Sequence, residues 1–335
     1  MKSGTTPVNR KPIMKPIERD AVAAGVVTFN PDIDRLMENL GAVSPQAGHL
    51  IIFDNGSRNI VDIRTAVGEI ENADLIECAE NLGVATALNR IASSASERGF
   101  RWLLTLDQDS VCAPDMIEKL SKYATEETPL VTPFILDRNK MTTADFLELS
   151  LPPVQFFRHA AIKGAITSGG LMNLQVFDDV QRFDEQFFID CVDYDFNMRL
   201  MRAGYRIARV NDTYLLHELG IARKTWLRTP RKTLDGRWRW ETFYSFGHSP
   251  VRCYYKARNR VLYSRKHWRS IGFSNEGIAQ IPQQMFLTLL FEEEKFSKFR
   301  AFLRGVVDGV RAPLVQQQEN SRTPLAAKPR ILNKF

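Results

Sequence analysis

Residues 103–110 read LLTLDQDS, an apolar strand pattern followed directly by two carboxylates, Asp107 and Asp109. The apolar run predicts a buried strand, but aspartate is disfavoured inside strands. The two aspartates therefore lie beyond the strand end, either in an ordinary polar turn or helix cap, or at a site for a cation. Carboxylates one residue apart in a loop can bind a hard divalent cation, with phosphate oxygens completing its shell.

Strand and helix patterns alternate through the first third of the chain. Their spacing of about 25 residues predicts an α/β fold with a Rossmann-like, mainly parallel central sheet flanked by helices. The turn signals Asn30-Pro31 and Asp54-Asn55-Gly56 end the first two strands. We expect strands within 21–30, 49–57, 74–80 and 100–110, and helices within 32–43, 59–67 and 81–99.

Polar side chains follow three of these strands at the point where each strand ends. In a parallel sheet these carboxyl ends share one edge, where ligands bind. No G-x-G-x-x-G follows the first strand and no G-x-x-x-x-G-K-[ST] occurs, so a standard dinucleotide site and a Walker-type phosphate loop are both disfavoured. The expected ligand site is formed by Thr28, Asn30, Asp54, Asn55, Asp107 and Asp109.

The sequence FFIDCVDYDFNMR (187–199) crowds Asp190, Asp193 and Asp195 together at the predicted start of a helix. Acidic residues there favour the helix dipole and cap its free N–H groups, which is a purely structural explanation. The functional alternative is that one of them is a general base, which removes the proton of an alcohol as it attacks.

His217 ends a later strand pattern, in LLHELG. A lone histidine at a strand end is more often structural than a ligand. Beside Asp107 and Asp109 it would instead be a third metal ligand, and imidazole fits Mn²⁺ better than Mg²⁺.

The net charge of +6 is concentrated in residues 219–275, which hold 14 Lys and Arg against 2 Asp and Glu. Tryptophans are interleaved with these basic residues, at 226, 238, 240 and 268. This composition suits an anionic membrane surface, a diphosphate or nucleic acid, and a solvated basic face is the alternative. Within it, Arg258 is placed to bind an anionic leaving group unless 250–260 is simply a basic amphipathic helix.

Residues 281–314 predict two amphipathic helices, which would lie in a membrane interface or form a dimerisation surface. The four cysteines are scattered without a C-x-x-C pair, which favours free thiols in a reducing compartment. No signal-peptide core occurs in the first 20 residues, and no run of 18 apolar residues occurs anywhere. We therefore expect a cytoplasmic protein, at most peripheral on the inner face of the plasma membrane.

Eight motifs of this chain occur together in one order, over roughly residues 22–310. With them the chain resembles the inverting family 2 glycosyltransferases, and in particular the bacterial rhamnosyltransferases of O-antigen and surface polysaccharide synthesis. The resemblance implies a GT-A fold, a nucleotide-sugar donor and a Mg²⁺ or Mn²⁺ ion. The motifs are VVTFNP, IIFDNGS, NLGVATALN, LTLDQDS, SGGLMN, FDEQFFIDCVDYDFNMR, LLHELG and RCYYKARN.

The resemblance also implies roles for individual residues. Asp193 falls at the general-base position, although Val192 stands where the family usually has glutamate, and Asp195-Phe196-Asn197 departs from the usual Glu-Trp-Cys. The metal would be held by Asp107, Asp109 and His217. The donor would be bound by Thr28, Asn30, Asp54, Asn55, Asn81, Asp107 and Arg258, and the acceptor by Gly169, Gly170, Asp190 and Asp195.

These inferences divide the chain into a flexible arm (1–20), a GT-A catalytic domain (21–218), a basic and helical extension (219–314) and a disordered tail (315–335). Within the catalytic domain, 21–112 would bind the nucleotide sugar and 113–218 the acceptor. Transfer of L-rhamnose from dTDP-rhamnose to a saccharide or lipid-linked saccharide is expected, and galactofuranose or another hexose from a UDP-sugar is the alternative.

Two other classes fit the sequence less well. A nucleotidyltransferase would need a glycine-rich loop with a basic residue after the first strand, and VVTFNP lacks one. A nucleic-acid binder would not need acidic residues at strand ends or at 190–195. No nucleic-acid partner is therefore expected, and a homodimer stays open.

Overall fold

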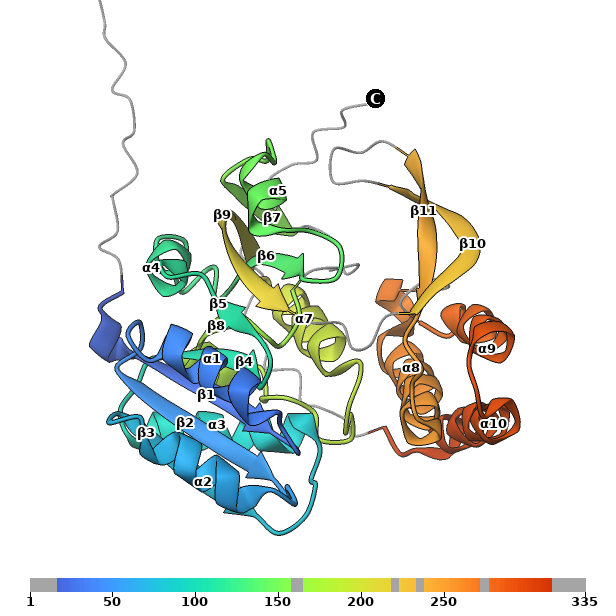
Figure 1. Ribbon diagram of the computed structural model, residues 1–335, viewed down its shortest axis with the longest axis horizontal. Coiled ribbons are helices and arrows are strands. Elements are labelled where there is room, and N and C mark those ends of the chain that lie inside the picture. The colour runs from blue at the N-terminus through green and yellow to red at the C-terminus, as the bar shows by residue number, and fades with distance from the viewer. Residues whose placement is uncertain (1–16, 158–164, 218–222, 233–237, 272–276, 315–335) are drawn as a thin grey trace, which may run out of the picture.

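The computed structural model describes residues 17–157, 165–217, 223–232, 238–271 and 277–314. These residues form an α/β part built on one large sheet and, beside it, a C-terminal part of helices with a two-stranded hairpin (Figure 1). The sheet has nine strands in the order β3-β2-β1-β4-β8-β6-β9-β5, with β7 paired to β9. The predicted arm falls almost entirely, and the predicted tail entirely, outside the described residues.

The first four strands are parallel, as the alternating pattern predicts. Asp32 begins the first helix by accepting a hydrogen bond from the Arg35 amide. Gly25 lets a helix approach β1 closely, since a Cβ there would overlap the Ile91 side chain. The elements are η1 (Arg19–Ala21), β1 (Val22–Thr28), α1 (Ile33–Val43), β2 (His49–Asn55), α2 (Ile60–Gly68), β3 (Ala73–Cys78), α3 (Val84–Glu97) and β4 (Trp102–Asp107).

The second half of the sheet is mixed. The strand that follows Gly169 runs antiparallel to both of its neighbours, β4 and β6, whereas β6 and β9 are parallel to each other. The elements are β5 (Val111–Cys112), α4 (Met116–Ser121), β6 (Leu130–Asp137), α5 (Thr143–Leu147), β7 (Val154–Phe157), β8 (Gly170–Asn173), α6 (Leu174–Asp179), α7 (Val192–Arg202) and β9 (Ile207–His217).

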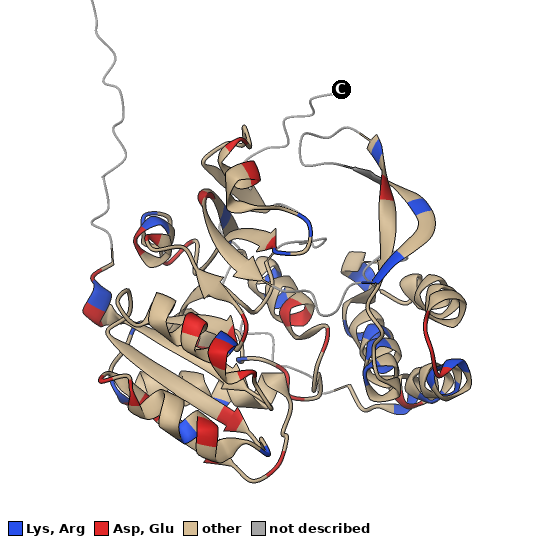
Figure 2. Cartoon of the chain, in the orientation of Figure 1, with Lys and Arg blue, Asp and Glu red and all other residues tan. Residues whose placement is uncertain are grey.

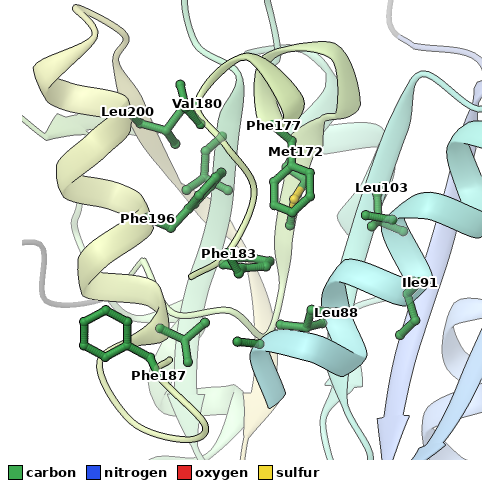
Figure 3. Close-up of a cluster of buried hydrophobic side chains, with 14 of the residues drawn as sticks. Leu88, Ile91, Leu103, Met172, Phe177, Val180, Phe183, Phe187, Phe196 and Leu200 are labelled. Atoms are coloured by element: carbon green, nitrogen blue, oxygen red, sulfur yellow. The ribbon is translucent and has the colours of Figure 1, made fainter. Parts of the chain in front are cut away.

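Buried apolar side chains cover both faces of the sheet. On one face, aromatic rings from α6, α7 and the chain between them pack together, with ring centroids 4.8 Å apart between Phe183 and Phe196 and 5.0 Å apart between Phe177 and Phe183 (Figure 3). This packing fixes α7, whose first turn carries Asp193, against the sheet.

The C-terminal part consists of a long basic helix, two shorter helices and a hairpin that the sequence analysis did not predict. Two glycines let the last helix lie close to the basic one, because a Cβ at Gly305 or Gly309 would overlap its backbone. The two helices expected within 281–314 are confirmed. The elements are β10 (Arg223–Lys232), β11 (Trp238–Ser245), α8 (Pro250–Ile271), α9 (Gln280–Phe291) and α10 (Lys295–Arg311). Of the helices described, none is long and apolar enough to cross a bilayer.

Candidate active site

The loop after β4 is fixed through its backbone. The Asp107 amide donates to Ser168 Oγ at 3.0 Å, and the Asp107 carbonyl accepts from Asn39 Nδ2 at 2.8 Å. The Ser110 amide also donates to the Asp107 carbonyl, at 3.2 Å, which closes a turn. These bonds engage main-chain atoms, so they position the Asp107 and Asp109 carboxylates without using them.

The structure brings His217 to this loop, as predicted. Pairing of β5 with β9 places the end of β9 beside the loop, and His217 Nδ1 lies 3.0 Å from Ser110 Oγ. The Ser110 hydroxyl lies 2.9 Å from Ser168 Oγ in turn. The imidazole is thereby held in one orientation by a buried hydroxyl pair.

The charges of this cluster act on one another. Burial raises the pKa of Asp107, and the negative charge of Asp109 raises it further, whereas His217 and Arg252 lower it. A carboxylate whose ionisation is disfavoured, beside a second acidic side chain, is a donor set that a divalent cation would stabilise. Among the described residues, no three His, Cys, Asp or Glu side chains already surround a common point for a metal ion. A cation held by these carboxylates would take further oxygen ligands from a bound group such as a diphosphate.

Asp193 lies in the first turn of α7, directly after an unusual backbone turn. Asp190 and Cys191 both have positive φ, at 65° and 66°, a conformation that non-glycine residues rarely adopt and that recurs at functional sites. Burial is the main cause that raises the pKa of Asp193 to about 7, and the charges of Asp190 and Asp107 add to it, against a lowering hydrogen bond from the Tyr194 amide. The carboxylate is therefore poised to exchange a proton near neutral pH.

The two glycines predicted to bind the acceptor shape the backbone beside Asp193. Gly169 has φ +82°, and its amide donates to the Thr105 carbonyl at 2.7 Å where the chain enters β8. Gly170 lines the same small cavity as Asp193 and Thr167. The structure thus places Gly170 near the predicted base, and Gly169 makes the turn that positions it.

Asp190 faces the C-terminal part. Its carboxylate lies 3.6 Å from Arg252 of α8. Asn259, also on α8, donates to the carbonyls of Ile189 and Asp190, at 2.6 Å and 3.1 Å. The loop that precedes Asp193 is therefore held by the C-terminal part as well as by the sheet.

Asp195 does not have the surroundings expected of an acceptor ligand. Its side chain is fully buried and pairs with Arg199, Lys266 and His267, each at 2.8 Å. Burial alone would raise the pKa of Asp195, but these cationic and hydrogen-bonding partners outweigh it and lower the pKa. This geometry favours a role in fastening α7 to α8 over the acceptor contact that the sequence predicted.

The residues predicted to bind the nucleoside do gather at the carboxyl ends of β1–β3. Thr28 donates to Asp54 at 3.0 Å, and Asn55 accepts from the Leu82 amide at 2.8 Å. Asn30 accepts from the Arg58 amide and Asn81 from the Gly83 amide, both at 2.9 Å. Thr28, Asp54 and Asn55 are buried, so these three shape the loops that a nucleoside would meet.

Of two further residues at this edge, Phe29 was missed by the sequence analysis, whereas Arg252 belongs to the basic stretch 250–260 that the sequence analysis singled out. Phe29 exposes 45% of its surface beside the Asp107–Ser110 turn, and its amide donates to the Gln108 side chain at 2.7 Å. Arg252 acts electrostatically on Asp107 and lies beside Asp190. An exposed aromatic residue directly after a polar strand end was the available signal for Phe29.

Arg258 is occupied by other partners. Its guanidinium donates to the Gln186 carbonyl at 2.7 Å and to the Asn259 side chain at 2.8 Å. It therefore braces the chain before Asp190, and Arg252, six residues earlier on α8, is the arginine nearer to the two-aspartate loop. The geometry favours Arg252 over Arg258 for contact with an anionic group.

Comparison with known proteins identifies the first part of the chain. The family model described as glycosyl transferase family 2 matches residues 25–176, which include β1–β4 and the two-aspartate loop. The chain is 25% identical over 300 residues to the dTDP-rhamnosyl transferase RfbF of Shigella flexneri, covering 87% of this chain and 95% of that protein. It is 24% identical over 242 residues to the N-acetylglucosaminyl-diphospho-decaprenol L-rhamnosyltransferase of Mycobacterium tuberculosis, covering 59% of this chain and 76% of that one.

Two solved structures resemble the fold, each with a TM-score of 0.52 at 13% identity. One is GalNAc-T7 crystallised with UDP, GalNAc and Mn²⁺, where the match covers 83% of this chain and 53% of that chain. The other is S. aureus TarS 1-349, where it covers 87% of this chain and 80% of that one. Both are similar to this chain in fold alone. The fold is therefore GT-A, and the family match together with the rhamnosyltransferase relatives identifies the chain as a glycosyltransferase whose residues 25–176 match the family 2 model.

Proposed function

We propose that the protein is an inverting glycosyltransferase that moves a sugar from a nucleotide-sugar donor to a hydroxyl group of a saccharide or lipid-linked saccharide. The observation that carries this proposal is Asp193, a half-buried carboxylate in the first turn of α7 whose pKa is raised to about 7, in small part by the negative charge of Asp107. A base and an anion-binding loop at one sheet edge suit a single displacement at an anomeric carbon, and one displacement inverts the configuration.

Asp193 is the proposed general base. It takes the proton from the acceptor hydroxyl as the oxygen attacks, and the product oxygen then carries the sugar. Gly170 lines the same small cavity as the base, and Asp190 lies on the loop that leads into α7. Asp195 is a positioning residue in this scheme, because its contacts with α8 fix the helix that carries the base.

The two-aspartate loop is the proposed diphosphate site. Asp109 would hold a Mg²⁺ or Mn²⁺ ion, with Asp107 and His217 beside it. Such an ion would stabilise the charge that develops on the departing diphosphate. Arg252 lies next to Asp190 and acts electrostatically on Asp107, and its guanidinium can add hydrogen bonds to phosphate oxygens.

The nucleoside is placed over the loops after β1–β3. Phe29 offers an exposed ring for stacking with the base, and Asn30 and Asn81 offer polar groups on the same loops. The similarity to a dTDP-rhamnosyl transferase over most of both chains supports dTDP-rhamnose as donor. A UDP-linked galactofuranose or other hexose is the alternative.

The acceptor is proposed to be a lipid-linked saccharide reached at the inner face of the plasma membrane. A relative whose name includes diphospho-decaprenol supports this. We propose the same division of the chain as the sequence predicts, into a catalytic domain (21–218), with a donor half ending at 112, and an extension (219–314) whose helix α8 contacts the loop before Asp193.

A thermal-shift screen tests the donor class. We expect dTDP or UDP with Mn²⁺ to raise the melting temperature of the wild-type chain, because the nucleotide binds only the folded state. The Asp109→Asn variant should lose the Mn²⁺-dependent part of that shift. Stabilisation by oligonucleotides but by no nucleoside diphosphate would contradict the proposal.

A further inference from the structure

The C-terminal part carries a large group of exposed apolar side chains on three connected elements. Trp226, Trp238 and Trp240 of the hairpin expose 76%, 70% and 64% of their surface. We call the whole group the C-terminal apolar surface; besides these tryptophans it comprises Phe286 and Leu290 of α9 and Phe296, Leu303, Val307 and Val310 of α10. Single exposed apolar residues are ordinary, but a concentration of large ones marks an interaction surface.

Contacts between the elements make this one surface. Trp226 of β10 and Phe243 of β11 both pack on Phe291 at the end of α9, with ring centroids 5.5 Å and 5.7 Å apart. Helix α10 begins four residues later, at Lys295. The hairpin, α9 and α10 lie together at the edge of the molecule away from β1–β3 (Figure 1).

Helix α10 shows why its outer residues need a partner. Phe302, Gly305 and Gly309 are buried on the side that packs against α8. Phe296, Leu303 and Val307 lie on the opposite side at helical spacing, and they are exposed. The helix therefore has two apolar faces, of which the fold covers one.

Basic residues border this surface. The strand Arg223–Lys232 holds five Lys and Arg and no Asp or Glu, and Lys295–Arg311 holds five against one Asp. Figure 2 shows Lys and Arg over the hairpin, α8 and α10, together with acidic residues on β11 and in the turn between α9 and α10 (residues 292–294). Arg300 and Arg304 follow the exposed stripe of α10 along its side.

We propose that the C-terminal apolar surface docks the protein on an anionic phospholipid bilayer. Tryptophan favours the membrane–water interface because its ring is apolar and its N–H is polar. Basic residues beside it are attracted to anionic headgroups. Insertion of apolar side chains and electrostatic attraction, each weak alone, therefore add to each other. A second copy of the chain is disfavoured as the occupant because two surfaces of the same positive charge repel each other.

Vesicle sedimentation with the full chain tests this docking. We expect wild-type protein to bind vesicles of phosphatidylcholine and phosphatidylglycerol at low salt, and to bind pure phosphatidylcholine much less. The double variant Trp238→Ala/Trp240→Ala should bind anionic vesicles at least about tenfold more weakly, and Trp238→Phe/Trp240→Phe should retain most of the binding. Leu147→Ala, which removes a largely exposed apolar residue on α5, is the matched control and should bind as wild type does.

Two results would overturn the proposal. One is equal vesicle binding by wild type and the folded Trp→Ala double variant. The other is a wild-type dimer, seen by light scattering without lipid, that the same double variant converts to monomer. Consumption of the nucleotide-sugar donor is measured separately, in solution without vesicles. Failure of the proposed transfer reaction would therefore leave a positive vesicle result valid, and failure of vesicle binding would leave a positive transfer result valid.

Discussion

At the scale of single residues, the transfer reaction is proposed to depend on Asp193 as its general base. Replacing it by Asn keeps the size of the side chain and removes its ability to accept a proton. We expect turnover to fall by about 10²-fold or more, the usual loss when a general base is removed, with donor affinity nearly unchanged. Steady-state kinetics against donor concentration measure both. Asp212→Asn, an exposed residue of β9, is the control, and near-normal turnover in Asp193→Asn would remove the assignment.

The pH dependence of turnover follows from the same residue. The folded protein raises the pKa of Asp193 from 3.8 to about 7, chiefly by burial. Since the base must be ionised to accept a proton, turnover should rise with pH through about 7 and then level off. A profile of turnover at saturating donor checks this, and an acid limb centred near pH 4 would show that the ionising group is an unperturbed carboxyl.

The residues of the two-aspartate loop support a metal prediction. Removing divalent ions with EDTA should abolish transfer, and added Mn²⁺ or Mg²⁺ should restore it, because two carboxylates and a diphosphate would otherwise repel each other. Asp109→Asn should need more metal for half-maximal activity than wild type. Activity that survives exhaustive chelation contradicts the role given to Asp109.

Sequence patterns predicted where the site residues at the strand ends lie. They did not predict the partners of site residues that contact distant parts of the chain. Asp107 and Asp54 were predictable because parallel strands bring their ends to one edge. The burial of Asp195 was not, because its partners Lys266 and His267 come from a helix about 70 residues away. For the same reason, spacing alone did not show that Arg258 points to a backbone carbonyl and Arg252 to the acidic loop.

At the scale of elements, the contact between α7 and α8 depends on one buried carboxylate. Replacing Asp195 by Asn leaves Arg199 without its buried counter-charge and leaves Lys266 with Asp184 as its remaining carboxylate, which should cost about 3–5 kcal/mol of stability. Denaturant unfolding of the variant measures the loss. Asp179→Asn, at the end of α6, is the control because the same substitution is made there at a partly exposed carboxylate. A loss below about 1 kcal/mol would show that the network does not fasten the two helices.

The same contact predicts sensitivity to acid. The pKa of Asp195 is lowered in the folded state, so the stability it provides is present above the unfolded pKa of about 4 and is lost as the pH falls below it. Burial lowers the pKa of His267, so stability also falls as the pH drops below about 6.5, where the unfolded histidine gains a proton. Melting temperatures should therefore decrease between pH 8 and 4 because of His267, and decrease further below about pH 4 because of Asp195. Asp195→Asn should lack only the second decrease.

The hairpin is the element that sequence analysis missed, although a signal for it was present. Asp235-Gly236 between two runs rich in Thr, Trp, Phe and Tyr is a hairpin pattern. The many Arg and Lys residues in this stretch obscure the β propensity of its Thr, Trp, Phe and Tyr residues. The antiparallel placement of β8 was harder to foresee, because a four-residue strand after two glycines carries no sign of its partners.

At the scale of the whole molecule, the C-terminal part completes the site and also faces outward. Asn259 and Arg252 of α8 reach the loop before Asp193, while α9, α10 and the hairpin carry the exposed apolar surface. A protein docked through this surface would hold its sheet edge at a fixed height above the bilayer. That arrangement suits an acceptor whose saccharide is linked to a lipid.

The most direct measurement is a transfer assay with a panel of nucleotide sugars, followed by NMR of the anomeric configuration of the product. We predict that dTDP-rhamnose, or failing that a UDP-sugar, is consumed in the presence of Mn²⁺ or Mg²⁺. The product should have the opposite anomeric configuration to the donor, because Asp193 supports a single displacement. A product that retains the donor configuration would contradict this mechanism, and no consumption of any nucleotide sugar with any acceptor would contradict the proposed reaction.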